Sequence, residues 1–277
     1  MLRRQCVART STEMHMEVSS VRTGPMMELQ SYPPWIQDIV AECNDARRGV
    51  VEHECFQLMR DGALSPHAMR MFLAGAWPVI EQFPQYMAMN LLKVQYGFAP
   101  GHEMARKYLI RNIRVEQNHV EYWTDWAQAH GLSEEELFFG RRSTSAEALS
   151  HWCWHTCERD PLPVAMAATN YAIEGATGEW AALVCSSADY ESGFKPEARK
   201  RAMQWLRVHA QYDDKHPWQA LEIIATLVGK HATARDISGI ESSIRKSYEY
   251  MRMMFDDCLV HEQCSSTARI QKRAMTG

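Results

Sequence analysis

The sequence His209-Ala-Gln-Tyr-Asp213-Asp-Lys-His216 places two histidines and an aspartate at positions i, i+4 and i+7. An α-helix turns by about 100° per residue, so these side chains would lie within ~60° of one another on one helical face. Two imidazoles and a carboxylate on such a face can bind a metal ion. The alternative is a solvated polar stripe, since a chain with 12 histidines will contain some spacings of this kind by chance.

Length and charge limit the classes of protein to consider. The 277 residues are enough for one large domain or two small ones. A net charge of −4 provides no basic field, so we expect no nucleic-acid partner. The sequence contains no apolar run of about 18 residues or more, so we expect no membrane association. The basic residues near Met1 are not followed by the apolar segment of a secretory signal. The 8 cysteines, without a Cys-x-x-Cys pair, indicate reduced thiols in a cytoplasmic protein.

Helical periodicity runs through most of the chain, with proline and glycine between the segments. No strand alternation, glycine-rich phosphate loop or Gly-x-Ser-x-Gly motif occurs, so we expect an all-α fold. One domain is expected over 33–260, between a loose N-terminal extension (1–32) and a flexible tail (261–277). The longer expected helices cover roughly 35–48, 66–96, 102–130, 146–157, 162–187, 196–216, 218–230 and 236–260.

Two carboxylates lie in apolar stretches of sequence. Glu81 lies between two prolines that would bend its helix, and its neighbours are mostly apolar. Glu174 follows an Ala-rich apolar stretch, and Glu179 is a rival carboxylate on the same helix. A buried carboxylate is costly unless it is paired or bound to a cation. Gly175 and Gly178 would let another helix or a ligand approach this segment closely.

Glu116-x-x-His119 places a carboxylate and an imidazole at i and i+3, on one face of a helix. Bundle di-iron proteins supply ligands in this form, although Glu and His three residues apart on a solvated face is the commoner outcome.

Together these segments offer four carboxylates and three imidazoles. Two divalent cations would neutralise four carboxylates, which would otherwise repel one another when buried and have raised pKa values. Mixed imidazole and carboxylate ligation suits iron or manganese, and the lack of thiolates argues against a structural zinc site. The candidate ligands are Glu81, Glu116, His119, Glu174, His209, Asp213 and His216.

This pattern resembles the haem-oxygenase-like di-iron oxidase and oxygenase family within the TenA and PqqC superfamily. The resemblance covers residues from about 35 to 230, and the histidine- and aspartate-bearing segment is its most specific part. It implies a single-domain haem-oxygenase-like bundle of about seven to nine helices. The segments that carry it are Gln82-Phe-Pro84 after Glu81, Glu116-x-x-His119 with Trp123, Tyr171-x-x-Glu174, and His209-x3-Asp213-x2-His216.

The resemblance implies a non-haem di-iron enzyme that binds two Fe(II)/Fe(III) ions and uses O2 as cosubstrate. Its small-molecule substrate would be an amino acid or an amine, oxidised by N-oxygenation, desaturation or oxidative C–C cleavage in a specialised biosynthetic pathway. Oxygenation would need an external electron donor, whereas desaturation or cleavage can draw electrons from the substrate. The substrate's identity, the electron donor and the formation of a homodimer stay open.

One position departs from the pattern of some family members. They carry a carboxylate seven residues before the histidine of the third ligand helix, where this chain has Asn112; others carry it three residues before, where it has Glu116. The departure concerns the ligands of the second metal ion of the expected pair, not those of the first. Pro217 directly after His216 disfavours helical geometry, so the ligand helix should break or kink there.

Rival functions also stay open. A TenA-like thiaminase would share the fold but use a cysteine nucleophile, for which Cys153, Cys157 and Cys185 are candidates without an activated setting. A PqqC-like oxidase would need no cofactor and no metal-type residues in register. A regulator would need a DNA-reading helix or a basic stripe, which the sequence does not provide.

Aromatic residues and methionine on the inner helix faces would shape a small dry pocket, although each is individually more often plain core. Arg111 and Arg207 are candidates for binding a substrate carboxylate, only by nearness in sequence. The candidate pocket residues are Trp77, Tyr86, Met87, Trp123 and Tyr171.

Overall fold

The computed structural model describes residues 21–212 and 215–274, and within these the side chains of 21–211 and 215–260. This described part contains helices and connecting turns but no strand, which confirms the expected all-α, single-domain fold. None of the described helices combines the length and apolar character needed to cross a membrane. The elements are η1 Leu29–Ser31, α1 Pro34–Glu42, α2 Asn44–Val51, α3 Glu54–Arg60, α4 Pro66–Leu91, α5 Pro100–Glu116, α6 His119–Ala129, α7 Glu134–Phe139, α8 Thr144–Arg159, α9 Leu162–Met166, η2 Ala167–Ile173, α10 Glu174–Cys185, α11 Asp189–Ser192, α12 Pro196–Ala202, α13 Gln204–Tyr212, α14 His216–Val228 and α15 Ala234–Ala274.

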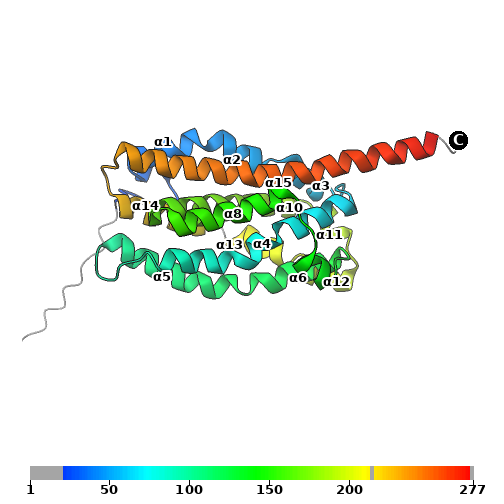
Figure 1. Ribbon diagram of the computed structural model, residues 1–277, viewed down its shortest axis with the longest axis horizontal. Helices are drawn as coiled ribbons and strands as arrows, with labels where there is room; N and C mark the ends of the chain where they lie inside the picture. Colours follow the sequence, from blue (N-terminus) through cyan, green and yellow to red (C-terminus); the bar gives the residue numbers. More distant parts are fainter. Residues whose placement is uncertain (1–20, 213–214, 275–277) are drawn as a thin grey trace, which may run out of the picture.

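The long helices run roughly along one axis, as Figure 1 shows. The α15 helix packs on α4, α8 and η2, and α10 packs closely on α13. The α4 helix also contacts α5, α6 and α8, so it lies at the centre of the bundle. This arrangement directs residues from α5, α6, α10 and α13 toward a common interior.

Aromatic side chains from different helices fill the middle of the core. Phe56 stacks on Trp180 with ring centroids 4.4 Å apart, and Trp123 contacts Trp205 at 4.7 Å. The expected apolar stripe of α15 is confirmed, because all its members are buried. This stripe consists of Ile240, Ile244, Tyr248, Met251 and Phe255.

Two helices that were expected to be continuous are divided at the candidate ligands. Residues 102–130 form α5 and α6, which meet between Glu116 and His119. Residues 196–216 form α12 and α13, while His216 begins α14. The expected single helical face for His209 and His216 is therefore wrong. Pro217 lies in the first turn of α14, where the missing N–H of proline breaks no helical hydrogen bond. The helical path is therefore interrupted before His216 and not after it.

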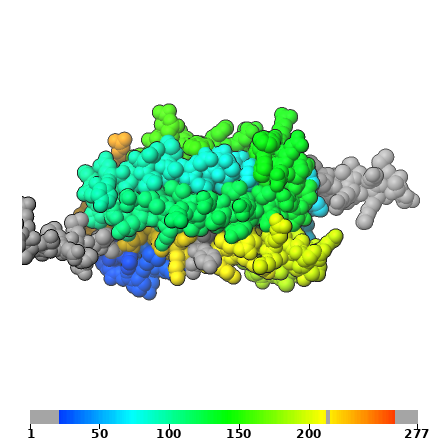
Figure 2. Space-filling model, turned by 90° about the horizontal axis from the view of Figure 1, so that it is seen from below, coloured from blue at the N-terminus to red at the C-terminus, as the bar shows by residue number. Residues whose placement is uncertain are grey.

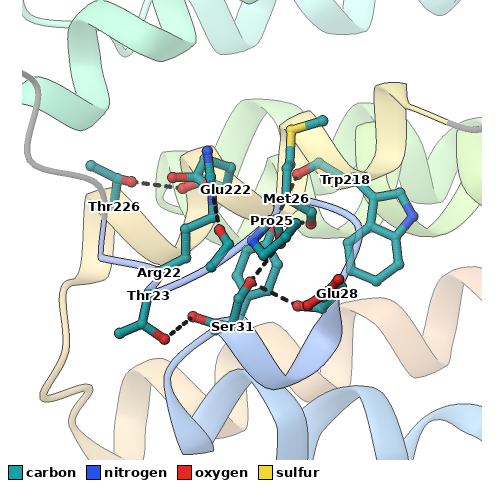
Figure 3. Close-up of polar contacts among 11 residues, drawn as sticks. Arg22, Thr23, Pro25, Met26, Glu28, Ser31, Trp218, Glu222 and Thr226 are labelled. Carbon is teal, nitrogen blue, oxygen red and sulfur yellow. Dashed lines mark hydrogen bonds and ion pairs between the residues drawn. The ribbon is translucent and has the colours of Figure 1, made fainter.

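The described part of the N-terminal extension is packed, contrary to expectation. Arg22 forms an ion pair with Glu222, a buried residue of α14. The Tyr32 hydroxyl donates to the Met26 carbonyl oxygen at 2.8 Å, and Ser31 Oγ donates to that of Pro25 at 2.7 Å (Figure 3). Figure 2 shows this segment, in blue, lying on the surface beside α14. A buried carboxylate on α14 needs a cation, and Arg22 provides it.

The C-terminal segment continues the last helix. α15 runs to Ala274 and extends beyond the bundle (Figure 1), and the flexibility expected from residue 261 onward stays a prediction. No proline or glycine occurs between 261 and 274 to end the helix.

Candidate metal centre

Three buried side chains from three helices meet at the centre of the bundle. Glu116 is the last residue of α5, His119 is the first of α6, and His209 lies on α13. One ligand atom of each lies within 4.8 Å of those of the other two. The three residues are only 5–6% exposed. A carboxylate and two imidazoles at this separation, away from solvent, are suited to hold a cation.

Hydrogen bonds fix the orientation of both imidazoles. His209 Nδ1 lies 2.8 Å from the Trp205 carbonyl oxygen, which can only accept, so this nitrogen carries the proton. His209 also stacks on the Trp205 ring, with centroids 3.8 Å apart. His119 Nδ1 lies 2.7 Å from Glu116 Oε2, and the His119 and His209 rings are 4.5 Å apart. Metal-binding histidines are commonly oriented in this way through their second nitrogen.

Burial changes the protonation of the cluster. It raises the pKa of the Glu116 carboxyl, an effect that the His119 hydrogen bond opposes and the nearby charge of Glu174 reinforces. Burial, with the nearby His119 and His216, lowers the pKa of His209 well below its usual range. His209 is therefore neutral at physiological pH, which is the form that binds metal ions.

A second pair lies beside this cluster. His216 Nδ1, at the start of α14, lies 3.0 Å from Glu174 Oε1 at the start of α10. The Tyr108 hydroxyl donates to Glu174 Oε2 at 3.2 Å, and Asn170 Nδ2 donates to the same oxygen at 3.3 Å. Glu174 therefore has partners on both carboxylate oxygens although it is buried.

Local backbone features bring this pair together. The segment before Glu174, η2, is a π-helix, and such segments often occur at functional sites. Gly175, the next residue, lies against Pro217: a Cβ built on it would be 3.2 Å from the Pro217 ring. The predicted close approach at Gly175 is thus present, and it allows α14 to place His216 beside Glu174.

The structure brings five of the seven predicted ligands together and does not do so for Glu81. Glu81 is half-buried, and its carboxylate accepts a long 3.5 Å hydrogen bond from Gln85 Nε2 on the same helix. Its position is roughly opposite that of the cavity-lining Phe72 and Phe83 around the α4 axis. Its apolar neighbours in sequence therefore bury other faces of α4. Asp213 lies outside the described residues. The five that meet are Glu116, His119, Glu174, His209 and His216.

Solvent exposure distinguishes Glu174 from Glu179, the rival carboxylate on α10. Glu179 is exposed and forms an ion pair with Arg47, whereas Glu174 is buried. Of the two, only Glu174 lies at the centre.

A cavity of about 60 Å³ adjoins the cluster, and its wall is mainly apolar. Among the predicted pocket residues, Trp123 lines it, whereas the others do not. No arginine or lysine is among the lining residues. Arg111 instead donates to Gln219 at 2.5 Å, and Arg207 pairs with Glu191 at 2.7 Å. The lining side chains are Phe72, Ala76, Val79, Ile80, Phe83, Glu116, His119, Trp123, Leu149, Ile173, Glu174, Thr177, Trp180, Trp205, His209, Met254 and Phe255.

Several residues of the site were not found from the sequence. Tyr108, Asn112 and Glu116 are spaced four residues apart on α5, and this spacing was the available signal for a shared polar face. Asn112 is fully buried, and its side-chain Nδ2 has no hydrogen-bond partner. Asn170 and Trp205 each lie four residues before the candidate ligand that they contact, Glu174 and His209, so this i, i+4 spacing was the available signal for them.

The candidate cysteine nucleophiles lie outside this cavity wall. Burial raises the pKa of Cys157 to about 12 and that of Cys153 well above its usual range. Burial also raises the pKa of Cys185. Thiols in such surroundings stay protonated at neutral pH and are poor nucleophiles.

The donor set fits iron. Imidazole and carboxylate ligands suit iron and manganese, and the three residues that meet most closely include no thiolate. The neutral state of His209 and the negative charge available on the carboxylates both favour a divalent cation.

Comparison with known proteins assigns the class. A family model described as an iron-containing redox enzyme matches residues 70–247, and the chain belongs to this family. A solved TenA homologue from Pseudomonas syringae pv. tomato is 53% identical, with a TM-score of 0.85, over 86% of this chain and 98% of that one.

More distant relatives support the fold. A domain of unknown function from Shewanella denitrificans, described as having a haem-oxygenase-like fold, has a TM-score of 0.63 at 12% identity, over 83% of this chain and 92% of that one. The expected haem-oxygenase-like fold is thereby confirmed. A Chlamydia pneumoniae protein named 4-aminobenzoate synthase is 22% identical over 83% of this chain and 98% of its own length.

Proposed function

We propose that this protein is a non-haem di-iron oxidase or oxygenase that uses O2 to oxidise a small substrate. The observation that carries the proposal is the buried cluster of Glu116, His119 and His209 beside an apolar cavity, with Glu174 and His216 next to it. Asp213 is included on the sequence spacing alone, and Glu81 is left out. The proposed ligands are Glu116, His119, Glu174, His209, Asp213 and His216.

The chemistry requires a group that reacts with O2, which protein side chains do not supply. Iron bound by these residues would supply the electrons and open coordination positions through which O2 is activated. The protein's task is then to hold the ligands, exclude water and handle protons.

The chain orients its ligands through neighbouring groups. The Trp205 carbonyl holds His209 through Nδ1, so that Nε2 bears the lone pair of the neutral ring. Tyr108 and Asn170 donate to Glu174 Oε2 and fix the direction of this carboxylate. Rigid ligands favour a reproducible geometry for the reaction.

Protons and water are controlled by burial. Burial raises the pKa of Glu116 in the metal-free chain, so its carboxyl would release a proton when a cation binds. The apolar cavity wall, including Phe72, Phe83 and Phe255, excludes water from the reacting groups.

The substrate that we propose is an amine or an amino acid, oxidised by N-oxygenation, desaturation or C–C cleavage. The Chlamydia pneumoniae relative bears the name of an enzyme whose product carries an amine on an aromatic ring, which supports small nitrogen-containing molecules. For oxygenation, an external electron donor would complete the reaction.

The test is iron loading followed by exposure to O2. We expect the anaerobically reconstituted chain to bind about two Fe(II) ions and to consume O2 faster with an amine from a substrate panel. A chelator should abolish this consumption, and restored Fe(II) should return it. A chain that binds no iron, or that consumes substrate equally after chelation, would contradict the proposal.

A TenA-like thiaminase is the alternative, supported by similarity to a putative TenA-like thiaminase from Sulfolobus solfataricus (TM-score 0.61, 14% identity). The buried thiols disfavour it because their raised pKa values reduce the thiolate. Thiol alkylation and chelation separate the two: a thiaminase should be inactivated only by alkylation, and an iron enzyme only by chelation.

A further inference from the structure

The outer side of α5 carries positive charge that nearby carboxylates do not neutralise. Four cations and two apolar side chains line one hollow of about 520 Å³ there, and none of these lining residues is acidic. Within the described part of the chain, only Lys107 of the four cations pairs with a carboxylate, that of Glu103. We call this surface the α5 basic face, and it consists of Arg106, Lys107, Ile110, Arg111, Arg114 and Val115.

Arginines elsewhere on the molecule commonly have acidic partners. Ion pairs with carboxylates are formed by Arg47, Arg60, Arg70, Arg201, Arg207 and Arg245. On the α5 basic face, Arg106 instead lies over the Tyr96 ring, 5.4 Å from its centroid, and Arg111 donates to the neutral amide of Gln219. This face is therefore locally positive on a chain whose net charge is −4.

The same helix carries a candidate ligand on its opposite side. Arg114 and Val115 directly precede Glu116, which ends α5 and is buried. Because an α-helix turns by about 100° per residue, Glu116 lies roughly 200° around the axis from Arg114. A molecule seated on the face is thus separated from Glu116 by about one helix diameter, about 10–12 Å. The α5 helix lies along the lower edge of the bundle in Figure 1 and faces the reader in Figure 2.

We propose that the α5 basic face is the docking surface for an acidic electron-carrier protein. The inference rests on the proposed function, because oxygenation by that function requires electrons from an external donor. Each encounter would oxidise the carrier by one electron and reduce iron at the centre from the ferric to the ferrous state. Two encounters supply the two electrons of one oxygenation. Electron transfer slows steeply with distance, so a face one helix away from the ligands is a suitable place for the carrier.

The composition of the face favours a protein partner. Arginine is enriched and lysine depleted in protein interfaces, and the face has three arginines and one lysine. Ile110 and Val115 are 39% and 38% exposed and offer apolar contact beside the charges. Interfaces of weak redox encounters are small, so a face of this size suffices.

Two other polyanions match the face less well. Four cations neutralise about four phosphates, fewer than the roughly 6–10 contacts of a typical nucleic-acid site. A bilayer surface is usually bound through apolar side chains that insert into it, and more than half of Ile110 and Val115 is already covered by the protein.

The test measures binding of a plant-type ferredoxin, an acidic [2Fe–2S] one-electron carrier, to the full chain. Titration of the iron-free and the iron-loaded protein should show binding at low ionic strength. This binding should weaken as salt is added, because exposed charges are screened beyond about 10 Å at 0.1 M ionic strength.

Matched charge reversals locate the surface. The double variant Arg106→Glu/Arg114→Glu should weaken ferredoxin binding about 10-fold or more, since like charges across an interface oppose association. Arg235→Glu/Arg252→Glu is the control, because it makes the same change in net charge on exposed arginines of α15, across the bundle from α5 (Figure 1). This control should bind ferredoxin as the unchanged protein does.

Several outcomes would overturn the docking surface. They are failure of ferredoxin to bind, equal affinity in the Arg106→Glu/Arg114→Glu variant, equal weakening in the control, and tighter binding of phosphatidylglycerol vesicles or a DNA duplex than of ferredoxin. Reduction of the ferric protein, followed by its absorption, should slow in this variant with reduced ferredoxin and stay unchanged with dithionite. Binding without such reduction would overturn the role of the carrier. Iron content measured on the same samples tests the proposed function separately, because ferredoxin binding does not require iron.

Discussion

The two parts of the candidate centre differ in how their charges are satisfied. Glu116, His119 and His209 lie beside the cavity, and their main polar neighbours are one another. Glu174 instead receives hydrogen bonds from the neutral side chains of Tyr108 and Asn170 as well as from His216. We expect the first part to bind a cation more tightly, because the carboxylate of the second already has several donors.

Asn112 reinforces this difference. It lies one helical turn before Glu116 on α5, fully buried, where some family members carry a carboxylate. A neutral amide at this position brings no negative charge to the centre. A second divalent cation would therefore be held with less charge compensation than a carboxylate would give.

The largest effect is expected from His209→Ala. This change removes an imidazole of the tighter part, and we expect iron affinity to fall by about 100-fold or more, since even residues that only orient a ligand commonly contribute 10- to 100-fold. Competition with a coloured chelator measures it. His130→Gln is the control, because His130 is a mostly buried histidine that pairs with Tyr190 outside the centre. Unchanged affinity in His209→Ala would remove it from the ligand set.

Glu174→Gln should separate the two parts. The amide keeps the size of the side chain but removes its charge, so we expect the iron bound per chain to fall from about two to about one. Metal analysis after gel filtration gives the number. Glu179→Gln lies on the same helix but is exposed, and it should bind iron as the unchanged protein does. Full loading of Glu174→Gln would contradict a role for this carboxylate.

A smaller effect is expected from Gly175→Ala. Its new Cβ would meet the Pro217 ring at 3.2 Å, so α14 has to shift by a few tenths of an ångström and His216 with it. We expect about 3-fold weaker binding of the second iron and little change in the first, on the scale of other indirect contributions. Gly49→Ala makes an ordinary 3.7 Å contact with Arg252 and serves as the control. Equal weakening of both irons would show that the two parts are not independent.

The smallest effect concerns pH and a histidine outside both parts. Burial lowers the pKa of His130 to about 4, below its unfolded value of about 6.5. Between these values the unfolded chain binds the proton and the folded chain does not, so the stability from His130 is present above pH ~6.5 and is lost as pH falls to ~4.

We expect this loss to be about 1–2 kcal/mol, allowing for the partial exposure of the ring. Urea unfolding of the iron-free protein at several pH values measures it, with His130→Gln as the comparison. Equal acid sensitivity of the two proteins would refute the assignment to His130. The difference also gives the background to subtract before any pH dependence is attributed to the metal centre.

The sequence predicted the helices better than their ends. The apolar stripe of α15 was found because burial on one face leaves a period in the sequence. The break after Glu116 was not predicted, because no glycine or proline lies between Glu116 and His119. The break predicted after His216 was misplaced, because proline prefers a first helical turn as well as ending the helix before it, and α14 begins at His216.

Sequence reasoning also succeeded for some candidate ligands and failed for another. Glu116 and His119 were singled out by their i, i+3 spacing and Glu174 by its apolar surroundings, and they meet in the interior. Glu81 was also chosen for its apolar surroundings and does not join them, since apolar sequence neighbours on a helix point to several faces. Surroundings in sequence thus indicate burial without indicating direction.

The sequence by itself determined that this protein is all-helical and carries acid and imidazole side chains in apolar segments, because periodicity and residue chemistry are local properties. Which of those side chains meet was decided by the tertiary structure. Helix breaks, the π-helical turn before Glu174 and the contact of Gly175 with Pro217 set the directions of side chains that are far apart in the chain. The positive charge of the α5 basic face also appears only there, since an ion-pair partner is a matter of three-dimensional position.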